Sequence, residues 1–310
     1  FSTIRIWEEM LFVGKLKYIC PYQIQMNKLA LITFTIFSAL TSCTNYGQLK
    51  VITDLPSSLK ENSGLVTYGD STVWAVEDNG NKDEIYQVNF KGDILKTLEV
   101  KNGKNDDWED LAKDTAGNLY VANIGNNHNN RKNLVIYKLP NPNSEPGDKI
   151  DAEQIEFNYP NQKEFPPKED ELLYDAEALF HHGNLLYIVT KNRTRPFKGE
   201  AHIYSVPDKA GKYEATLVGS FTPCTDWKTC QITSIDISPK GDKIVALSYG
   251  KLFVFTEFTW NDFSKGKLQE IELGARTQLE SVCFLNDNTL LISDERSHGT
   301  GGNLYSYHLK

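Results

Sequence analysis

Three glutamates of this chain each open an apolar run of residues, and an aspartate lies close to one of them. The three are Glu109, Glu177 and Glu280, and Asp175 lies two residues before Glu177. Oxygen ligands without paired His or Cys favour a hard cation such as Ca²⁺ over Zn²⁺. Ca²⁺ is therefore the candidate cofactor, and the candidate metal ligands are Glu109, Asp175, Glu177 and Glu280.

Two other roles are open for the same carboxylates. They could accept hydrogen bonds from backbone N–H groups of a neighbouring unit and so fasten the fold, or they could take part directly in catalysis. The residue types alone do not separate these roles from metal binding.

A second group of polar side chains follows later apolar runs, in segments rich in Asn, Gly, Lys and Arg. Guanidinium and ammonium groups there could bind an anion beside the carboxylates. Turn formation and solvation explain the same composition without any ligand. The candidate ligand-binding residues are Trp108, Asn126, Asn127, Arg131, Lys191, Arg193 and Arg296.

Sequence motifs of common enzyme classes are absent: the chain has no HExxH, GxSxG, P-loop or dinucleotide-binding GxGxxG. A nucleophile with an oriented base cannot be assembled from the candidate residues. A binding module is therefore favoured. The alternative is a Ca²⁺-dependent hydrolase of phosphate esters, in which the metal polarises the substrate and the arginines hold the anion.

The elements that must position these side chains are short strands, because runs rich in Val, Ile, Tyr and Phe alternate with Gly, Asn and Asp turns. The pattern Ile85-Tyr86-Gln87-Val88 returns in five places, at intervals of about 50 residues. Repeats of this kind are typical of β-propellers. The sequence predicts an all-β propeller of five four-stranded blades. Six blades are the alternative, with strands hidden in the longer interval 141–171.

The fifth repeat reaches Lys310 without an outer strand, whereas an unpaired strand-like run, Leu49 to Leu55, precedes the first repeat. Adding this run to the last blade would close the ring and remove an exposed edge. In such a meander, first-strand starts and second-strand ends lie on one face. We therefore expect the carboxylates and the basic segments on that face.

The N-terminal part of the chain carries a targeting pattern. Residues 1–25 lack a starting Met and are expected to be a non-native upstream segment, whereas residues 26–42 have the charge, apolar run and small-residue site of a signal peptide. Leu40-Thr41-Ser42-Cys43 resembles the lipobox of bacterial lipoproteins. This implies a lipid on Cys43, a tether over 43–47, and a propeller over 48–310 anchored in the bacterial cell envelope, periplasmic or surface-exposed. An uncleaved anchor or ordinary secretion signal is the alternative.

Export permits disulfides. Cys224 and Cys230 lie six residues apart in a loop-like stretch and are the favoured pair, whereas Cys283 lies inside an apolar run and is expected to be buried.

The charge balance restricts the partners. There are 33 basic and 41 acidic residues, a net charge of -8, which is the wrong sign for a protein that binds nucleic acid through phosphates. We expect no nucleic-acid partner and a monomer. The expected partners are the membrane, through the lipid, and a small anionic ligand or a protein.

Three segments carry a resemblance to known proteins. They are Asp107 to Leu111, Asn123 to Asn127 and Asp175 to Leu179, and they resemble an uncharacterised group of exported bacterial β-propeller lipoproteins. More distantly, Asp-Ala-Glu-Ala-Leu is similar to a strand of calcium-dependent propeller phytases and esterase-like phytases, which bind Ca²⁺ and phosphate on one face. The resemblance implies that Glu109, Asp175 and Glu177 are metal ligands or their neighbours.

Overall fold

The computed structural model describes residues 46–297 and 299–310. Cys43, with its predicted lipid, and the predicted signal peptide lie outside the described residues. Within the described ranges, no helix is long and apolar enough to cross a membrane.

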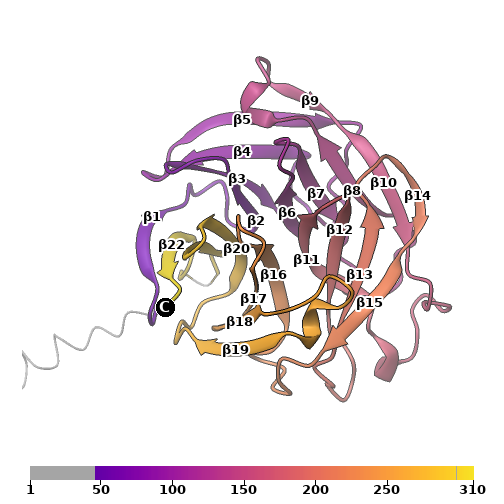
Figure 1. Cartoon of the computed structure of the whole chain (residues 1–310). Helices are drawn as coiled ribbons and strands as arrows, with labels where there is room; N and C mark the ends of the chain where they lie inside the picture. The colour runs from indigo at the N-terminus through magenta and orange to yellow at the C-terminus, as the bar shows by residue number, and fades with distance from the viewer. Residues whose placement is uncertain (1–45, 298) are drawn as a thin grey trace, which may run out of the picture. The chain divides into compact units, whose positions relative to one another are not determined.

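The described strands form five sheets arranged as the blades of a ring (Figure 1), which confirms the predicted five-bladed propeller over the six-bladed alternative. Blade 1 contains β2 (Asn62–Thr67), β3 (Thr72–Glu77), β4 (Glu84–Asn89), β5 (Ile94–Lys101) and β9 (Lys149–Asp151). Blade 2 contains β6 (Asp110–Lys113), β7 (Leu119–Asn123), β8 (Leu134–Leu139), β10 (Glu153–Asn158) and β14 (Gly211–Glu214).

The other three blades have four strands each. Blade 3 contains β11 (Asp175–His182), β12 (Leu185–Lys191), β13 (Ala201–Pro207) and β15 (Thr216–Phe221). Blade 4 contains β16 (Ile232–Ile237), β17 (Lys243–Ser248), β18 (Lys251–Thr256) and β19 (Lys267–Glu272). Blade 5 contains β20 (Leu279–Asn286), β21 (Thr289–Asp294), β22 (Asn303–His308) and β1 (Lys50–Asp54). Short 3₁₀ turns lie at Pro142–Ser144 (η1), Glu169–Glu171 (η2) and Phe263–Lys265 (η3).

The predicted closure by an N-terminal strand is confirmed. β1 pairs antiparallel with β22, so the start and the end of the propeller lie side by side in one blade, indigo beside yellow in Figure 1. Without β1, the aromatic strand β22 would be a sheet edge with unpaired backbone groups.

Two blades have five strands rather than the predicted four. β9 pairs parallel with β5 of blade 1, and β14 pairs parallel with β10 of blade 2. In each case a short strand joins the preceding blade, the strand is interrupted at Ala152 or Ala215, and the chain then continues as the outer strand of the next blade. The N–H groups of these two alanines still donate to the preceding blade, to Lys101 O at 3.0 Å and Asn158 O at 2.9 Å. The added strands therefore strap neighbouring blades together.

The core lies between blades, because each sheet is covered on both faces by its neighbours. β7 is buried at every position, and β3 is buried at all but its first. A strand covered on both faces reads as a continuous apolar run rather than an alternating one. This is why the inner strands of the repeats are so apolar.

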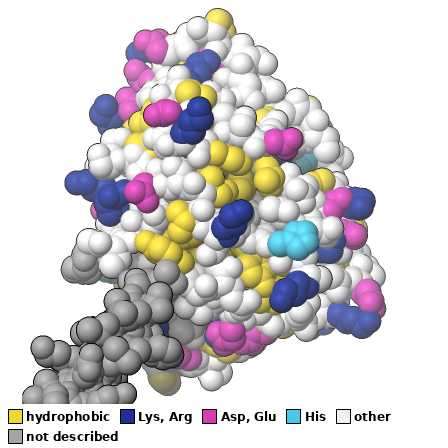
Figure 2. All heavy atoms as spheres, turned by 90° about the vertical axis from the view of Figure 1, so that its left-hand side faces the viewer, with side chains coloured by type: hydrophobic (Ala, Val, Ile, Leu, Met, Phe, Trp, Pro, Cys, Tyr) yellow, Lys and Arg dark blue, Asp and Glu magenta, His cyan; other side chains and the backbone are white. Residues whose placement is uncertain are grey.

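The side of the disc in Figure 2 has no dominant charge. Figure 2 shows one side of the molecule, where Lys and Arg intermingle with Asp and Glu around separate apolar patches. Exposed large apolar side chains of the outer strands include Val51, Ile94 and Leu95. The view contains no extended basic surface of the kind that nucleic acids require, and the lack of a nucleic-acid partner stays a prediction.

Candidate functional site

A β-bulge lies at the start of the innermost strand of the blades. The pairing register skips one residue at Ser63, Glu177, Thr233 and Glu280. In blade 2, the N–H of Glu109 donates to Ala122 O at 2.9 Å although Ala122 pairs with Asp110, so Glu109 occupies the equivalent position. A bulge re-aims one side chain out of the regular alternation. It brings residues about 50 positions apart toward the centre of one face.

Hydroxyls at two of the bulges fasten neighbouring blades. The Ser63 hydroxyl of blade 1 donates to Glu109 O, just before blade 2, at 2.7 Å, and the Thr233 hydroxyl of blade 4 donates to Leu279 O of blade 5 at 2.9 Å. Among the described residues, the side chains of the glutamates at the other bulges accept no hydrogen bond from a backbone N–H, and Glu109 Oε2 accepts only from the Ser63 hydroxyl, at 3.3 Å. Fastening through backbone N–H groups therefore falls to other residues.

The main fastening carboxylate is Asp110, one residue after the bulge. It is fully buried and accepts hydrogen bonds from Leu179 N at 3.0 Å and from the Ser234 hydroxyl at 3.1 Å. Ser234 in turn accepts from Val282 N at 3.1 Å. One carboxylate and one hydroxyl thus link blades 2, 3, 4 and 5 around the axis.

The bulge glutamates line a polar cavity of about 290 Å³ at the centre of this face. Six carboxylates surround it against two basic groups. The lining residues are Glu61, Ser63, Asp78, Glu109, Asn127, Glu177, Lys191, Arg193, Tyr249, Gln278, Glu280 and Glu295. Glu109, Glu177 and Glu280, predicted from the sequence to converge, therefore lie around one cavity with an excess of negative charge.

The two basic groups of the cavity are paired internally. Lys191 is buried, donates to Glu177, and lies 3.0 Å from the Tyr249 hydroxyl. Arg193 Nε contacts Asp175 at 2.6 Å, and its Nη2 contacts Glu177 at 3.0 Å. Asp175 lies fully buried beneath Arg193 and also accepts from Asn126 N at 2.7 Å. Asp175 and Glu177 thus already have cationic partners.

At one side of the cavity, three carboxylates approach one another without such partners. Ligand oxygens of Asp78, Asp107 and Glu109 all lie within 4.8 Å of one another. Asp107 is buried, and its Oδ1 has no hydrogen-bond partner among the described residues. The absence of a side chain at Gly125 leaves space for these carboxylates. A Cβ there would lie 2.1 Å from Glu109 Oε1 and 2.4 Å from Asp107 Oδ2.

Burial and mutual repulsion raise the pKa values of these groups. Burial, then the charge of Asp78, raises the pKa of Asp107 to about 7. Burial and the Glu177 charge hold the pKa of Glu109 well above its usual range. Burial also raises the pKa of Glu295 to about 7. A cavity of this charge favours protons or a cation.

Several residues predicted at the rim take other positions. Trp108 is fully buried in the core between blades 1 and 2, and its indole N–H donates to Lys104 O at 2.9 Å, so it packs rather than binds. Arg296 contacts Leu55 O at 3.2 Å and does not line the cavity. Arg131 is turned back toward Asn123 O at 3.3 Å. The physical reason is the same for both arginines: uncapped backbone carbonyls near them accept their guanidinium N–H groups.

Asn126 and Asn127 differ although they are adjacent. Asn126 is buried and its side chain accepts from Arg131 N at 2.9 Å, so it holds the loop. Asn127 is exposed, accepts from Arg193, and lines the cavity.

A second, larger hollow of about 770 Å³ adjoins the cavity and shares Asn127 and Arg193 with it. Apolar and aromatic side chains dominate its lining. It is lined by Asn127, His128, Pro166, Pro167, Glu169, Leu172, Asn192, Arg193, Thr194, Arg195, Pro196, Phe197, Trp227 and Gln231. Trp227 belongs to a loop joined by a disulfide between Cys224 and Cys230, the pair that their spacing favours, whereas Cys283 is a buried free thiol.

The sequence interpretation missed Asp78, Tyr249 and Glu295 as cavity residues. Each lies just after a second strand of its blade, at Glu77, Ser248 and Asp294, which is the position expected to face the carboxylates. The signal was present in the repeat, but polar residues in turns are too common to single these out.

Comparisons with known proteins support the fold. No protein-family model matches the chain, and no curated protein sequence matches it. A solved structure of the PQQ-bound form of aldose sugar dehydrogenase from Streptomyces coelicolor is similar, with a TM-score of 0.50 at 10% identity. The match covers 84% of this chain and 97% of that one. At this identity the likeness describes the β-propeller fold alone.

Proposed function

We propose that this protein is a ligand-binding propeller that binds Ca²⁺ through Asp78, Asp107 and Glu109, at one side of the central cavity. The observation that carries the proposal is the convergence of three carboxylates, one of which, Asp107, is buried with an Oδ1 that has no hydrogen-bond partner among the described residues. An orphaned buried oxygen is costly unless a cation or a donor satisfies it. Carboxylate oxygens suit a hard cation.

The metal set differs in part from the residues expected from the sequence. Glu109 is retained. Asp175 and Glu177 are paired with Arg193 and Lys191, and the charge of Lys191 also opposes the rise in the pKa of Glu280 that burial causes. We propose that these three tune the field of the cavity rather than ligate directly.

The charge of the cavity supports one of the two candidate functions over the other. A phosphate-ester hydrolase would need Arg131, Arg193 and Arg296 to hold an anion. All three donate to groups of the protein itself, and the cavity has an excess of carboxylates. These contacts support binding of a cation over an anionic substrate.

The test of the metal is a Ca²⁺ titration of the EDTA-treated protein, followed by calorimetry and thermal unfolding. Ca²⁺ at about 100 times its dissociation constant should stabilise the fold by about 2.7 kcal/mol, or about 5 °C. Because the pKa of Asp107 is about 7 in the metal-free protein, protons should compete and the affinity should fall as the pH drops below 7.

Asp107→Asn should abolish the response to Ca²⁺, whereas the control variant Asp106→Asn should retain it. Asp106 is adjacent in sequence but pairs with Lys104 and lies outside the cluster. A full Ca²⁺ response of Asp107→Asn would contradict the proposed site.

We further propose that the propeller is held at the bacterial cell envelope by a lipid on Cys43. The support is the lipobox pattern, and one or more acyl chains would supply the anchoring. Cells fed a fatty-acid analogue should label the wild-type protein and not the Cys43→Ser variant. Label retained by the variant would argue against lipidation at this residue.

A further inference from the structure

Trp227 is the one aromatic residue among the large apolar side chains that are exposed in the described part of the chain, with 57% of its surface accessible. It lines the 770 Å³ hollow beside the cavity. An isolated exposed apolar side chain is common on protein surfaces. Whether Trp227 can serve as a binding residue therefore depends on whether its loop holds it in place.

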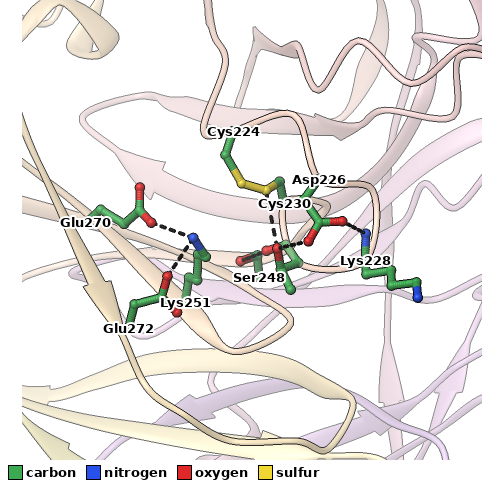
Figure 3. Close-up of a disulfide and its surroundings, with 9 residues drawn as sticks. Cys224, Asp226, Lys228, Cys230, Ser248, Lys251, Glu270 and Glu272 are labelled. Atoms are coloured by element: carbon green, nitrogen blue, oxygen red, sulfur yellow. Dashed lines mark hydrogen bonds and ion pairs between the residues drawn. A yellow bond between two sulfur atoms is a disulfide. The ribbon is translucent and has the colours of Figure 1, made fainter.

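The loop around Trp227 is braced on both sides. The Cys224–Cys230 disulfide closes it, and Asp226 accepts hydrogen bonds from Lys228 N at 3.0 Å and from the Thr229 hydroxyl at 3.1 Å (Figure 3). Asp226 O also accepts from Cys230 N at 2.9 Å. Trp227 thus extends from a loop whose backbone is tied immediately before and after it. Such pre-organisation lowers the entropy cost of binding.

The facing wall packs closely against this loop. Gly199 adopts φ +73°, and a Cβ there would lie 2.1 Å from Cys224 O, so the segment from Arg193 to Gly199 and the disulfide loop form one unit. Phe197 and Pro196 from this segment, with Pro166 and Pro167, line the same hollow as the indole. The volume lies within the ~300–1,000 Å³ range of small-ligand sites.

The polar groups at the hollow have both signs. The side chains of Arg195 and Glu169 both line it. Among the described residues, neither side chain has a hydrogen-bond or ion-pair partner. A guanidinium offers donors only, and a carboxylate acceptors only. A ligand that binds both Arg195 and Glu169 must itself offer acceptors and donors. A ligand with a net charge of either sign would be repelled by one of the two side chains.

From this combination we propose that the hollow binds a neutral saccharide. A sugar ring presents a flat C–H face, which packs on an exposed indole, and hydroxyls that both accept from Arg195 and donate to Glu169. An aromatic carboxylate would be repelled by Glu169 and an organic ammonium by Arg195. The proposal deepens the proposed function, since it rests on this face being the ligand-binding face.

The test is calorimetry of the full protein with neutral trisaccharides of glucose, mannose, galactose, xylose and N-acetylglucosamine, supported by tryptophan fluorescence. At least one sugar should bind and change the fluorescence. Trp227→Ala should weaken that binding about tenfold or more and remove the fluorescence change, with an unchanged melting temperature. Arg195→Gln should weaken it as well.

Leu217→Ala is the matched control, because Leu217 is also an exposed apolar residue, 48% accessible, but lies on β15 outside the hollow. It should bind as the wild type does. No binding of any of the five sugars at millimolar concentration, wild-type binding by Trp227→Ala, or tighter binding of an aromatic carboxylate such as benzoate would each overturn the proposal.

The two proposals fail separately. Sugar binding that persists in a protein without any Ca²⁺ response would contradict the metal site alone. A Ca²⁺ response without sugar binding would contradict the saccharide site alone.

Discussion

Deletion of Gly47–Leu55 is expected to prevent the propeller from folding stably. It contains β1, which pairs along β22, and the buried side chains Leu49 and Leu55. Its removal would leave β22 as an open edge and break the ring between the first and last blades. Circular dichroism and size-exclusion chromatography should show loss of the cooperative transition and aggregation.

A synthetic peptide of residues 48–55 supplied in trans should restore part of the stability, because an added strand can pair with an exposed sheet edge. A scrambled peptide of the same composition is the control. If the truncated protein melted like the full chain, closure by β1 would not be what holds the ring.

The second large effect is expected for Asp110→Ala. The substitution leaves the N–H groups of Leu179 and Leu111 and the Ser234 hydroxyl without their buried acceptor. Each unsatisfied buried group costs about 1–3 kcal/mol, so a loss of about 5 kcal/mol in the free energy of unfolding is expected. Thermal unfolding should show a decrease of more than about 10 °C.

Asp110→Asn should also destabilise the fold, because the NH₂ group of the asparagine would face the N–H and O–H donors that the carboxylate accepts in the wild type. Asp70→Ala, on an exposed turn, is the control and should change little. A melting temperature of Asp110→Ala within a degree of the wild type would mean that blade packing alone holds the axis together.

The hydrogen bonds near the central axis separate two groups of polar residues, those that join blades and those that line the cavity. Asp110, Ser63, Thr233 and Ser234 join blades, while the glutamates at the remaining bulges are left for the cavity. The fastening role considered for the repeated glutamates therefore falls mainly to their neighbours. Glu109 accepts the Ser63 hydroxyl at Oε2, and among the described residues no hydrogen bond uses its Oε1, so the proposed Ca²⁺ site can use that oxygen.

Much of the architecture was determined by the sequence itself. The recurring Ile-Tyr pattern, the spacing of about 50 residues and the unpaired run Leu49 to Leu55 were enough to predict five blades and their closure. Strand periodicity and repeat length are local properties of the chain. The convergence of Glu109, Glu177 and Glu280 followed from the same repeat, because equivalent positions of successive blades meet near the axis.

Only the tertiary structure decided which partner each polar group takes. Whether Arg193 meets a ligand or Asp175, whether Trp108 faces solvent or the core, and whether β9 and β14 join their own blade or the preceding one all depend on groups far away in the sequence. The same holds for the orphaned oxygen of Asp107 and for the bulges that aim the glutamates inward. Pairing energies and burial are properties of the assembled ring, and no local pattern of residues contains them.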